Sequence, residues 1–326
     1  MNVEIRLEDV FHLIFGLALS FVLVLIYLKI APKYGIIDQP NQRSSHSKPT
    51  IRGAGVVFPV LFIGFIFLFG HPGRLVDVIM AITLLGIVSF YDDVRDVPFG
   101  LRLFAQLIAV ALLFNELFVW LWPIWLLVFV GILIIATINA FNFMDGVNGI
   151  TGIYGLVTFV SLYVVKQDIA LLGLIAALMA FLFFNLRKKA KCFSGDVGAV
   201  SLAFIAAFYI LNVSVETKNP IWVLLLSVYG IDAAITILFR LIRKENITRG
   251  HRSHFYQILA NERQIPHVAV SIIYGTTQAL FNVLFFYFYF KQQMAPIVYA
   301  FAGLVIIYLA LRITLEGRTL VQPKQL

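Results

Sequence analysis

The chain is dominated by apolar blocks about as long as a membrane-crossing helix, which requires roughly 20 apolar residues. They do not alternate between apolar and polar residues, as the strands of a membrane β-barrel do. Only 13% of the residues are charged, about half of the share in soluble domains. We therefore predict one all-α domain, residues 1–326, folded as a polytopic transmembrane helix bundle of about eleven helices, or ten if two blocks form one helix. The blocks cover residues 11–30, 52–70, 74–91, 101–119, 122–140, 147–165, 168–186, 198–214, 220–240, 267–290 and 294–312.

The basic residues indicate the orientation of this bundle. With the N-terminus outside, alternating connections place 20 of the 25 Lys and Arg residues on the inner side, as the positive-inside rule requires. The C-terminus is then cytoplasmic, and the net charge of +8 is explained without a nucleic-acid partner. The chain begins with Glu4, Glu8 and Asp9, whereas a cleavable signal peptide begins with basic residues. We therefore expect the first block to remain as a membrane anchor.

Polar residues that can carry chemistry lie in five inner segments, about 31–52, 92–102, 139–149, 185–198 and 240–266. The first contains Arg43, His46 and Arg52 among Pro and Gly residues. It is either a basic connector beside the lipid headgroups or a loop that binds an anion through its cations and close backbone approach. The lone Cys192 excludes an internal disulfide framework.

The second segment begins with an adjacent pair of carboxylates, Asp92 and Asp93. Such a pair repels itself and must be solvated, paired or bound to a cation. It either ends a helix in water, with Arg95 as its local partner, or supplies a general base or part of a cation site. Arg102 and Gln106 follow four residues apart and share one helix face.

The third segment repeats a polar residue every three positions, at Asn139, Asn142 and Asp145, with Asn148 after a glycine. This spacing places the first three on one helix face. Polar side chains at the end of an apolar helix are costly unless they meet partners. They form either a capped helix end or one wall of a polar site.

The fourth segment ends in Gly195-Asp196-Val197-Gly198, directly before an apolar helix. Asp196 is either an ordinary N-cap or a ligand for Mg²⁺, which takes one or two carboxylates and leaves its other positions to water and phosphates. Asp232 lies inside the ninth block and either has a functional role or pairs with a neighbouring helix.

The last inner segment contains His251, Arg252 and His254. Two histidines three residues apart could bind a metal, but the neighbouring carboxylates and the lack of cysteine favour Mg²⁺ or Mn²⁺ over zinc. Arg252 suggests a phosphate clamp. Together the five segments hold the inventory of a metal-assisted phosphate reaction. A transporter, the main alternative, places its ionisable groups near the bilayer midplane, and a membrane scaffold is a third class.

These motifs resemble, over about residues 31–257, the polyprenyl-phosphate N-acetylhexosamine-1-phosphate transferases, which belong to glycosyltransferase family 4. The Arg-Ser-His-x-Tyr-Gln form of the last motif is nearer to the O-antigen initiators than to the peptidoglycan branch. The matching motifs are Asp-x-Pro-x-x-Arg-x-x-His-x-x-Pro-x-x-Arg at 38–52, the Asp92-Asp93 pair, Asn-x-x-Asn-x-x-Asp-Gly-x-Asn-Gly at 139–149, Gly-Asp-x-Gly at 195–198 and Arg-Ser-His at 252–254.

The resemblance implies transfer of a sugar 1-phosphate from a UDP-N-acetylated sugar to undecaprenyl phosphate, with release of UMP, at the cytoplasmic face of a bacterial inner membrane. The sugar is an N-acetylhexosamine or a 6-deoxy variant, and the product initiates O-antigen or another envelope polysaccharide. The reaction is a single displacement or passes through an aspartyl phosphate. A homodimer is expected at the level of the family.

The resemblance also assigns roles to the site residues. It implies Mg²⁺, or Mn²⁺, held by Asp196 and Asn142, and Asp92 and Asp93 as the pair that handles the lipid phosphate. His254 joins these as a catalytic candidate. The substrate-binding candidates are Arg43, His46, Arg52, Arg102, Asn139, Asp145, Asn148, His251 and Arg252.

Overall fold

The computed structural model describes residues 6–40, 48–246 and 252–320. Each predicted apolar block overlaps one main helix, which confirms the all-α class. The long helices are α1 (Leu7–Ile30), α2 (Val57–Phe69), α3 (Val76–Val94), α4 (Phe99–Glu116), α5 (Ile124–Met144), α6 (Ile150–Lys166), α7 (Ile169–Asn185), α8 (Gly195–Thr217), α9 (Ser227–Ile242), α11 (His267–Phe290) and α12 (Met294–Glu316). Short elements are α10 (Phe255–Gln257), the π-turn Ile258–Glu262, and 3-10 turns at Ala31–Tyr34, Ala54–Val56, Pro72–Arg74, Val119–Leu121, Pro220–Leu226 and Gly317–Leu320.

Seven helices in the described part of the chain are long and apolar enough to cross a membrane. Three shorter apolar helices accompany them, at Ala54–Phe69, Ile150–Lys166 and Ile169–Asn185. Many large apolar side chains on α1, α5 and α12 are exposed on the outside of the bundle, where lipid rather than water would cover them. The chain is therefore an all-α polytopic membrane protein.

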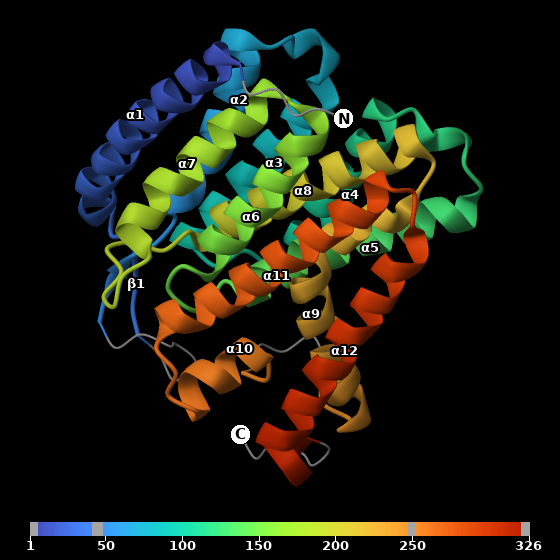
Figure 1. Ribbon diagram of the computed structural model, residues 1–326. Helices are drawn as coiled ribbons and strands as arrows, with labels where there is room; N and C mark the ends of the chain where they lie inside the picture. Colours follow the sequence, from blue (N-terminus) through green and yellow to red (C-terminus); the bar gives the residue numbers. More distant parts are fainter. Residues whose placement is uncertain (1–5, 41–47, 247–251, 321–326) are drawn as a thin grey trace.

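Helix α8 lies at the centre of the bundle and is buried along nearly its whole length. It packs against α3, α5, α2 and α6, while α7 packs against α1, α2 and α6. Figure 1 shows α1 and α12 on opposite sides of the molecule, with α6, α7, α8 and α11 between them. The elements that carry the predicted polar motifs therefore surround one end of a central helix.

A chain of buried side-chain hydrogen bonds joins α6 to α11. The Tyr154 hydroxyl donates to the Gln278 side-chain oxygen (2.9 Å). The Gln278 amide donates to Asn282 (2.6 Å), and the Asn282 amide donates to the Ser161 hydroxyl (2.9 Å). Because lipid offers no competing partners, such interhelical bonds help to fix helix pairs in membranes.

A small β-hairpin, which the apolar pattern did not predict, lies in the first inner segment. Strands β1 (Ile37–Asp38) and β2 (Thr50–Ile51) pair antiparallel, with Ile37 opposite Ile51. Ile51 also forms a parallel bridge with Cys192, in the connection between α7 and α8. Two inner segments distant in sequence are thereby joined by backbone pairing.

Two glycines let Phe65 of α2 insert between α1 and α7. A Cβ atom added at Gly173 would lie 2.5 Å from Cγ of Phe65, and one added at Gly16 would lie 2.8 Å from Cζ of the same ring. Both distances are shorter than side-chain contacts allow. The close packing of α1, α2 and α7 therefore depends on the missing side chains.

This packing predicts a stability difference between two glycine-to-alanine substitutions. Gly173→Ala forces Phe65 out of its place, and overpacking of this kind costs about 1–3 kcal/mol. Gly64→Ala, in α2, is the matched control because its new methyl group meets no atom within 4 Å. We expect a lower thermal unfolding midpoint for Gly173→Ala in detergent and little change for Gly64→Ala. Equal midpoints would contradict this account of the helix packing.

Candidate active site

Backbone pairing brings the first inner segment against the start of α8. The Phe193 amide donates to the Ile51 carbonyl (2.8 Å), and the Gly55 amide donates to the Ser194 carbonyl (2.9 Å). A Cβ atom at Gly55 would lie 2.4 Å from Cα of Gly198, so only glycine permits this approach. The glycines thus serve helix contact, and the approach places the neighbouring Arg52 at the first turn of α8.

Arg52 bridges two carboxylates from different helices. Its Nε lies 2.7 Å from Oδ1 of Asp93 on α3, and a terminal nitrogen lies 2.7 Å from Oδ1 of Asp196 on α8. The Asp93 side chain is fully buried, whereas 32% of the Arg52 side chain is exposed. Burial alone would lower the pKa of Arg52, but attraction to Asp196 and Asp93 outweighs burial and raises it. This guanidinium therefore stays charged and holds both acids together.

Asp93 also caps the N-terminus of α8. Its carboxylate accepts hydrogen bonds from the backbone amides of Asp196 (2.8 Å) and Val197 (3.1 Å), which suits the positive end of a helix dipole. Gly195 has a φ of +72°, and a Cβ there would lie 2.4 Å from the Asp93 carboxylate. The alternative prediction, in which Asp196 is the N-cap, is wrong because α3 supplies the cap and Asp196 lies within the first turn.

Asp92 has a different environment from its neighbour. It accepts a hydrogen bond from the Val97 amide (2.6 Å) and pairs with Arg102 (2.9 Å), so its partner is Arg102 rather than the predicted Arg95. The same Arg102 nitrogen lies 4.0 Å from Oδ2 of Asp196. Arg102 is the more accessible of the two arginines, with 39% of its side chain exposed.

The charges of this cluster do not balance. When all three acids are ionised, Asp92, Asp93 and Asp196 carry three negative charges against the two positive charges of Arg52 and Arg102. Within the described residues, no group of three His, Cys, Asp or Glu side chains forms a ready-made metal site. Mg²⁺ does not need such a group, because it takes one or two carboxylates and completes its shell with water and phosphate oxygens. Oxygen ligands with one excess negative charge are therefore compatible with Mg²⁺.

The motif at the end of α5 joins this cluster through hydrogen bonds. The Ser194 hydroxyl donates to the Asp145 carboxylate, and burial raises the pKa of Asp145 to about 6. The Asn139 amide donates to the Gln106 side chain (3.2 Å) on α4. The side of α5 that carries Asn139 therefore meets the side of α4 that carries Gln106.

Two further asparagines of this motif occupy distinct positions. The Asn148 amide donates to the Arg187 carbonyl (2.7 Å), which connects this motif to the α7–α8 connection. Asn142 lies in the last turn of α5, and its carbonyl accepts a hydrogen bond from the Asp145 amide (3.4 Å). The Asn142 side chain is partly buried.

The His254 segment lies against the same end of α5. The His254 ring packs beside Phe143, with ring centroids 6.3 Å apart, and the Tyr256 hydroxyl donates to the Phe143 carbonyl (2.8 Å). Arg252 begins this segment and is partly buried. Three further candidates, Arg43, His46 and His251, lie outside the described residues.

Comparison with known proteins finds similar sequences over this part of the chain. The model of glycosyl transferase family 4 matches residues 75–214, which include Asp92, Asp93, Asn142 and Asp196. Over these residues the chain is similar to glycosyl transferase family 4. Two curated relatives are both named undecaprenyl-phosphate alpha-N-acetylglucosaminyl 1-phosphate transferase. The one from Yersinia pestis is 26% identical over 72% of this chain and 71% of its own length, and the one from Salmonella typhi is 25% identical over 69% of each.

The structure also brings to this region polar residues that sequence reasoning did not single out. The Asn185 side chain accepts a hydrogen bond from the Gly149 amide (2.6 Å) and donates to the Cys192 carbonyl (2.7 Å). The Tyr27 hydroxyl of α1 donates to the Arg52 carbonyl (2.6 Å). Asn185 gave a signal, as a polar residue at the end of an apolar helix, whereas Tyr27 is one of many aromatic residues in α1 and gave none.

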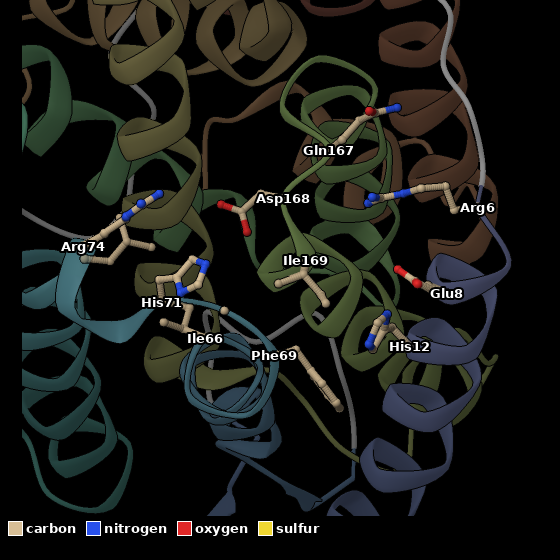
Figure 2. Close-up of a pocket in the computed structure, with 12 residues that line it drawn as sticks. Arg6, Glu8, His12, Ile66, Phe69, His71, Arg74, Gln167, Asp168 and Ile169 are labelled. Carbon is tan, nitrogen blue, oxygen red and sulfur yellow. The ribbon is translucent and has the colours of Figure 1, made fainter.

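A cavity of about 560 Å³ lies at the opposite end of the bundle (Figure 2). It is lined by the start of α1, the end of α2 and the α6–α7 connection, with Arg6, His12, Arg74 and Asp168 among its residues. The carboxylate cluster instead contacts the last turns of α1 and the start of α2. The described residues predicted for the site therefore do not line this cavity.

The cluster predicts unequal effects for its two arginines. Arg52→Gln leaves the fully buried Asp93 carboxylate without a cation, and breaking a buried pair in this way costs about 3 kcal/mol. Arg102→Gln breaks a partly exposed pair, which is worth about 1 kcal/mol or less. We expect a clearly larger drop in unfolding midpoint for Arg52→Gln, measured in detergent without substrates. A larger drop for Arg102→Gln would show that the bridge is not the main stabilising contact.

Proposed function

We propose that this protein transfers a sugar 1-phosphate from a UDP-N-acetylated sugar to undecaprenyl phosphate and releases UMP. One observation carries the proposal. Asp92, Asp93 and Asp196 are gathered by two arginines at one end of a membrane bundle. Carboxylates and guanidinium groups at this place suit a reaction between a charged nucleotide and a lipid phosphate. The names of the two relatives support the same reaction.

We further propose that this end faces the cytoplasm of a bacterial inner membrane. In this orientation eleven helices span the bilayer, the N-terminus is outside and the C-terminus is inside. The support is the strong excess of Lys and Arg in the segments around the cluster. Figure 1 agrees with an odd number of spans, since α1 begins at one end of the bundle and α12 ends at the other.

In the proposed reaction, an oxygen of the lipid phosphate attacks the phosphorus that carries the sugar. A new P–O–P bond forms, the bond to the uridine-bearing phosphate breaks, and UMP leaves with that oxygen. Asp92 keeps the lipid phosphate deprotonated, and Arg102 moves from Asp92 to a phosphate oxygen. Arg52 keeps Asp196 in place, and Arg252 and His254 hold the donor phosphates. Bound Mg²⁺, held by Asp196 and Asn142, would neutralise charge on the leaving phosphate.

The environment of Asp93 bears on the choice between one step and two. Its carboxylate is fully buried, pairs with Arg52 and accepts two backbone amides. A carboxylate held so completely is a poor nucleophile, because attack would break all of these contacts. A route through an aspartyl phosphate at Asp93 is therefore disfavoured, and we propose a single displacement.

The first experiment is an assay of UMP release by the detergent-purified protein. It contains undecaprenyl phosphate, Mg²⁺ and a panel of UDP sugars that includes N-acetylglucosamine and 6-deoxy N-acetylated sugars. Asp196→Asn should lower UMP release on the order of a hundredfold or more, because it removes a fixed charge at the reacting phosphates. Asp168→Asn, at the opposite end, is the matched control and should retain activity. Silence across the panel from folded protein would reject the reaction and favour transport.

Metal removal gives a second test. Chelation with EDTA should abolish UMP release, and excess Mg²⁺ or Mn²⁺ should restore it, because the cluster offers oxygen ligands. Zinc should not restore activity to the same level. Full activity in EDTA, after dialysis against the chelator, would remove the metal from the proposal.

A further inference from the structure

A buried carboxylate outside the cluster joins three helices. Asp232 of α9 is 0% exposed. It accepts hydrogen bonds from the Tyr274 hydroxyl of α11 (2.5 Å), the Tyr308 hydroxyl of α12 (3.1 Å) and the Thr236 hydroxyl one turn away (3.1 Å). A charge at such depth in a membrane bundle is costly unless it is fully paired. The energetic cost of burying Asp232, together with the several hydroxyl groups that donate to it, indicates that this carboxylate has a specific structural or functional role.

The same carboxylate holds the segment that carries His254. It accepts hydrogen bonds from the backbone amides of Phe255 (3.1 Å) and Tyr256 (3.4 Å), and its Oδ1 lies 3.2 Å from Nδ1 of His254. His254 is thus the N-cap of the short helix α10, and the first two amides of this helix donate to Asp232. The contact fixes both the backbone of the segment and the direction of the imidazole ring.

Arg312 of α12 supports this arrangement from the other side. It is fully buried and donates to the Thr236 hydroxyl (3.1 Å), the Tyr308 hydroxyl (3.0 Å) and the Ser253 carbonyl (3.1 Å). Its ion-pair partner is Glu316, one turn further along α12, and its bond to the Ser253 carbonyl contacts the residue before His254. The start of the turn is therefore held by side chains of α9 and α12.

We infer that Asp232 is a positioning residue that sets the place and ring orientation of His254 beside the end of α5. The inference rests on the proposed function for its kinetic consequence, but not for its structural one. His254 lies against Phe143, one residue from Asn142. A shift of the turn would therefore move the imidazole relative to the donor phosphates.

Hydrogen exchange tests the structural part without any substrate. Asp232→Asn keeps the shape of the side chain but removes its charge and one acceptor oxygen. The amides of Phe255 and Tyr256 should then exchange about tenfold faster or more, read by mass spectrometry of peptides covering 253–262. Asp168→Asn is the matched control, since Asp168 accepts the Ala170 amide (3.0 Å) and the Tyr209 hydroxyl (2.7 Å) at the far cavity (Figure 2). It should leave this segment unchanged.

If Asp232→Asn does not fold, Tyr274→Phe replaces it. This variant removes one donor to the same carboxylate, and exchange in 253–262 should still rise above that of the wild type. Unchanged exchange in the folded variant would overturn the inference.

A double-mutant cycle in the UMP assay tests the kinetic part. Asp232→Asn should lower kcat/KM between about tenfold and a hundredfold, as displacement of a working group does. His254→Gln should change kcat and KM in the same proportions as Asp232→Asn does. The double variant should have a kcat/KM no lower than that of the less active single variant, because both changes disable the same group, the His254 imidazole. Additive losses, or full activity of Asp232→Asn, would overturn the positioning role. A silent wild type would overturn the proposed function instead, and hydrogen exchange would still decide the contact.

Discussion

The bridge from Arg52 to Asp93 and Asp196 is the interaction on which the candidate site depends. Three carboxylates near one another repel strongly where little water screens them. The guanidinium can satisfy two of them at once because its nitrogens form a planar fork. This pairing fixes the end of α3, the start of α8 and the segment before α2 relative to one another. The third carboxylate, Asp92, pairs with the partly exposed Arg102, on the side where a substrate or cation can reach the cluster.

The placement of helix α8 depends on residues of the same charged cluster. Its first turn has no side-chain cap of its own, and the cap comes from Asp93 on α3. Its central position is permitted by close approaches at Gly55 and Gly198. The helix therefore could not be placed correctly without the residues that form the site. Folding of the bundle and construction of the site are one process at this end of the molecule.

The apolar pattern predicted the helices well because lipid forces each spanning segment to satisfy its own backbone. It failed at 52–56, where the predicted block begins but α2 has not yet started and the chain forms a 3-10 turn at Ala54–Val56, since Gly53 and Gly55 permit contacts that hydropathy does not register. The motif residues were predicted, but their partners were not. That Asp92 pairs with Arg102, and that Asp93 rather than Asp196 caps α8, depends on tertiary contacts that no spacing reveals. The role of Asn185 was missed for the same reason.

The separation of Arg52 from Asp196, 144 positions along the chain, has a consequence for biosynthesis. Membrane helices are delivered in order as the chain is made, from the N-terminus onward. Arg52, Asp92 and Asp93 are therefore made before α8, and the contacts of Arg52 and Asp93 with the first turn of α8 can form only after this helix follows. The burial of Asp93 is completed only when α8, which carries Gly195, Asp196 and Gly198, packs against α3. A chain whose synthesis stops before α8 would contain Arg52, Asp92 and Asp93 but would lack Asp196, so the candidate site would be incomplete.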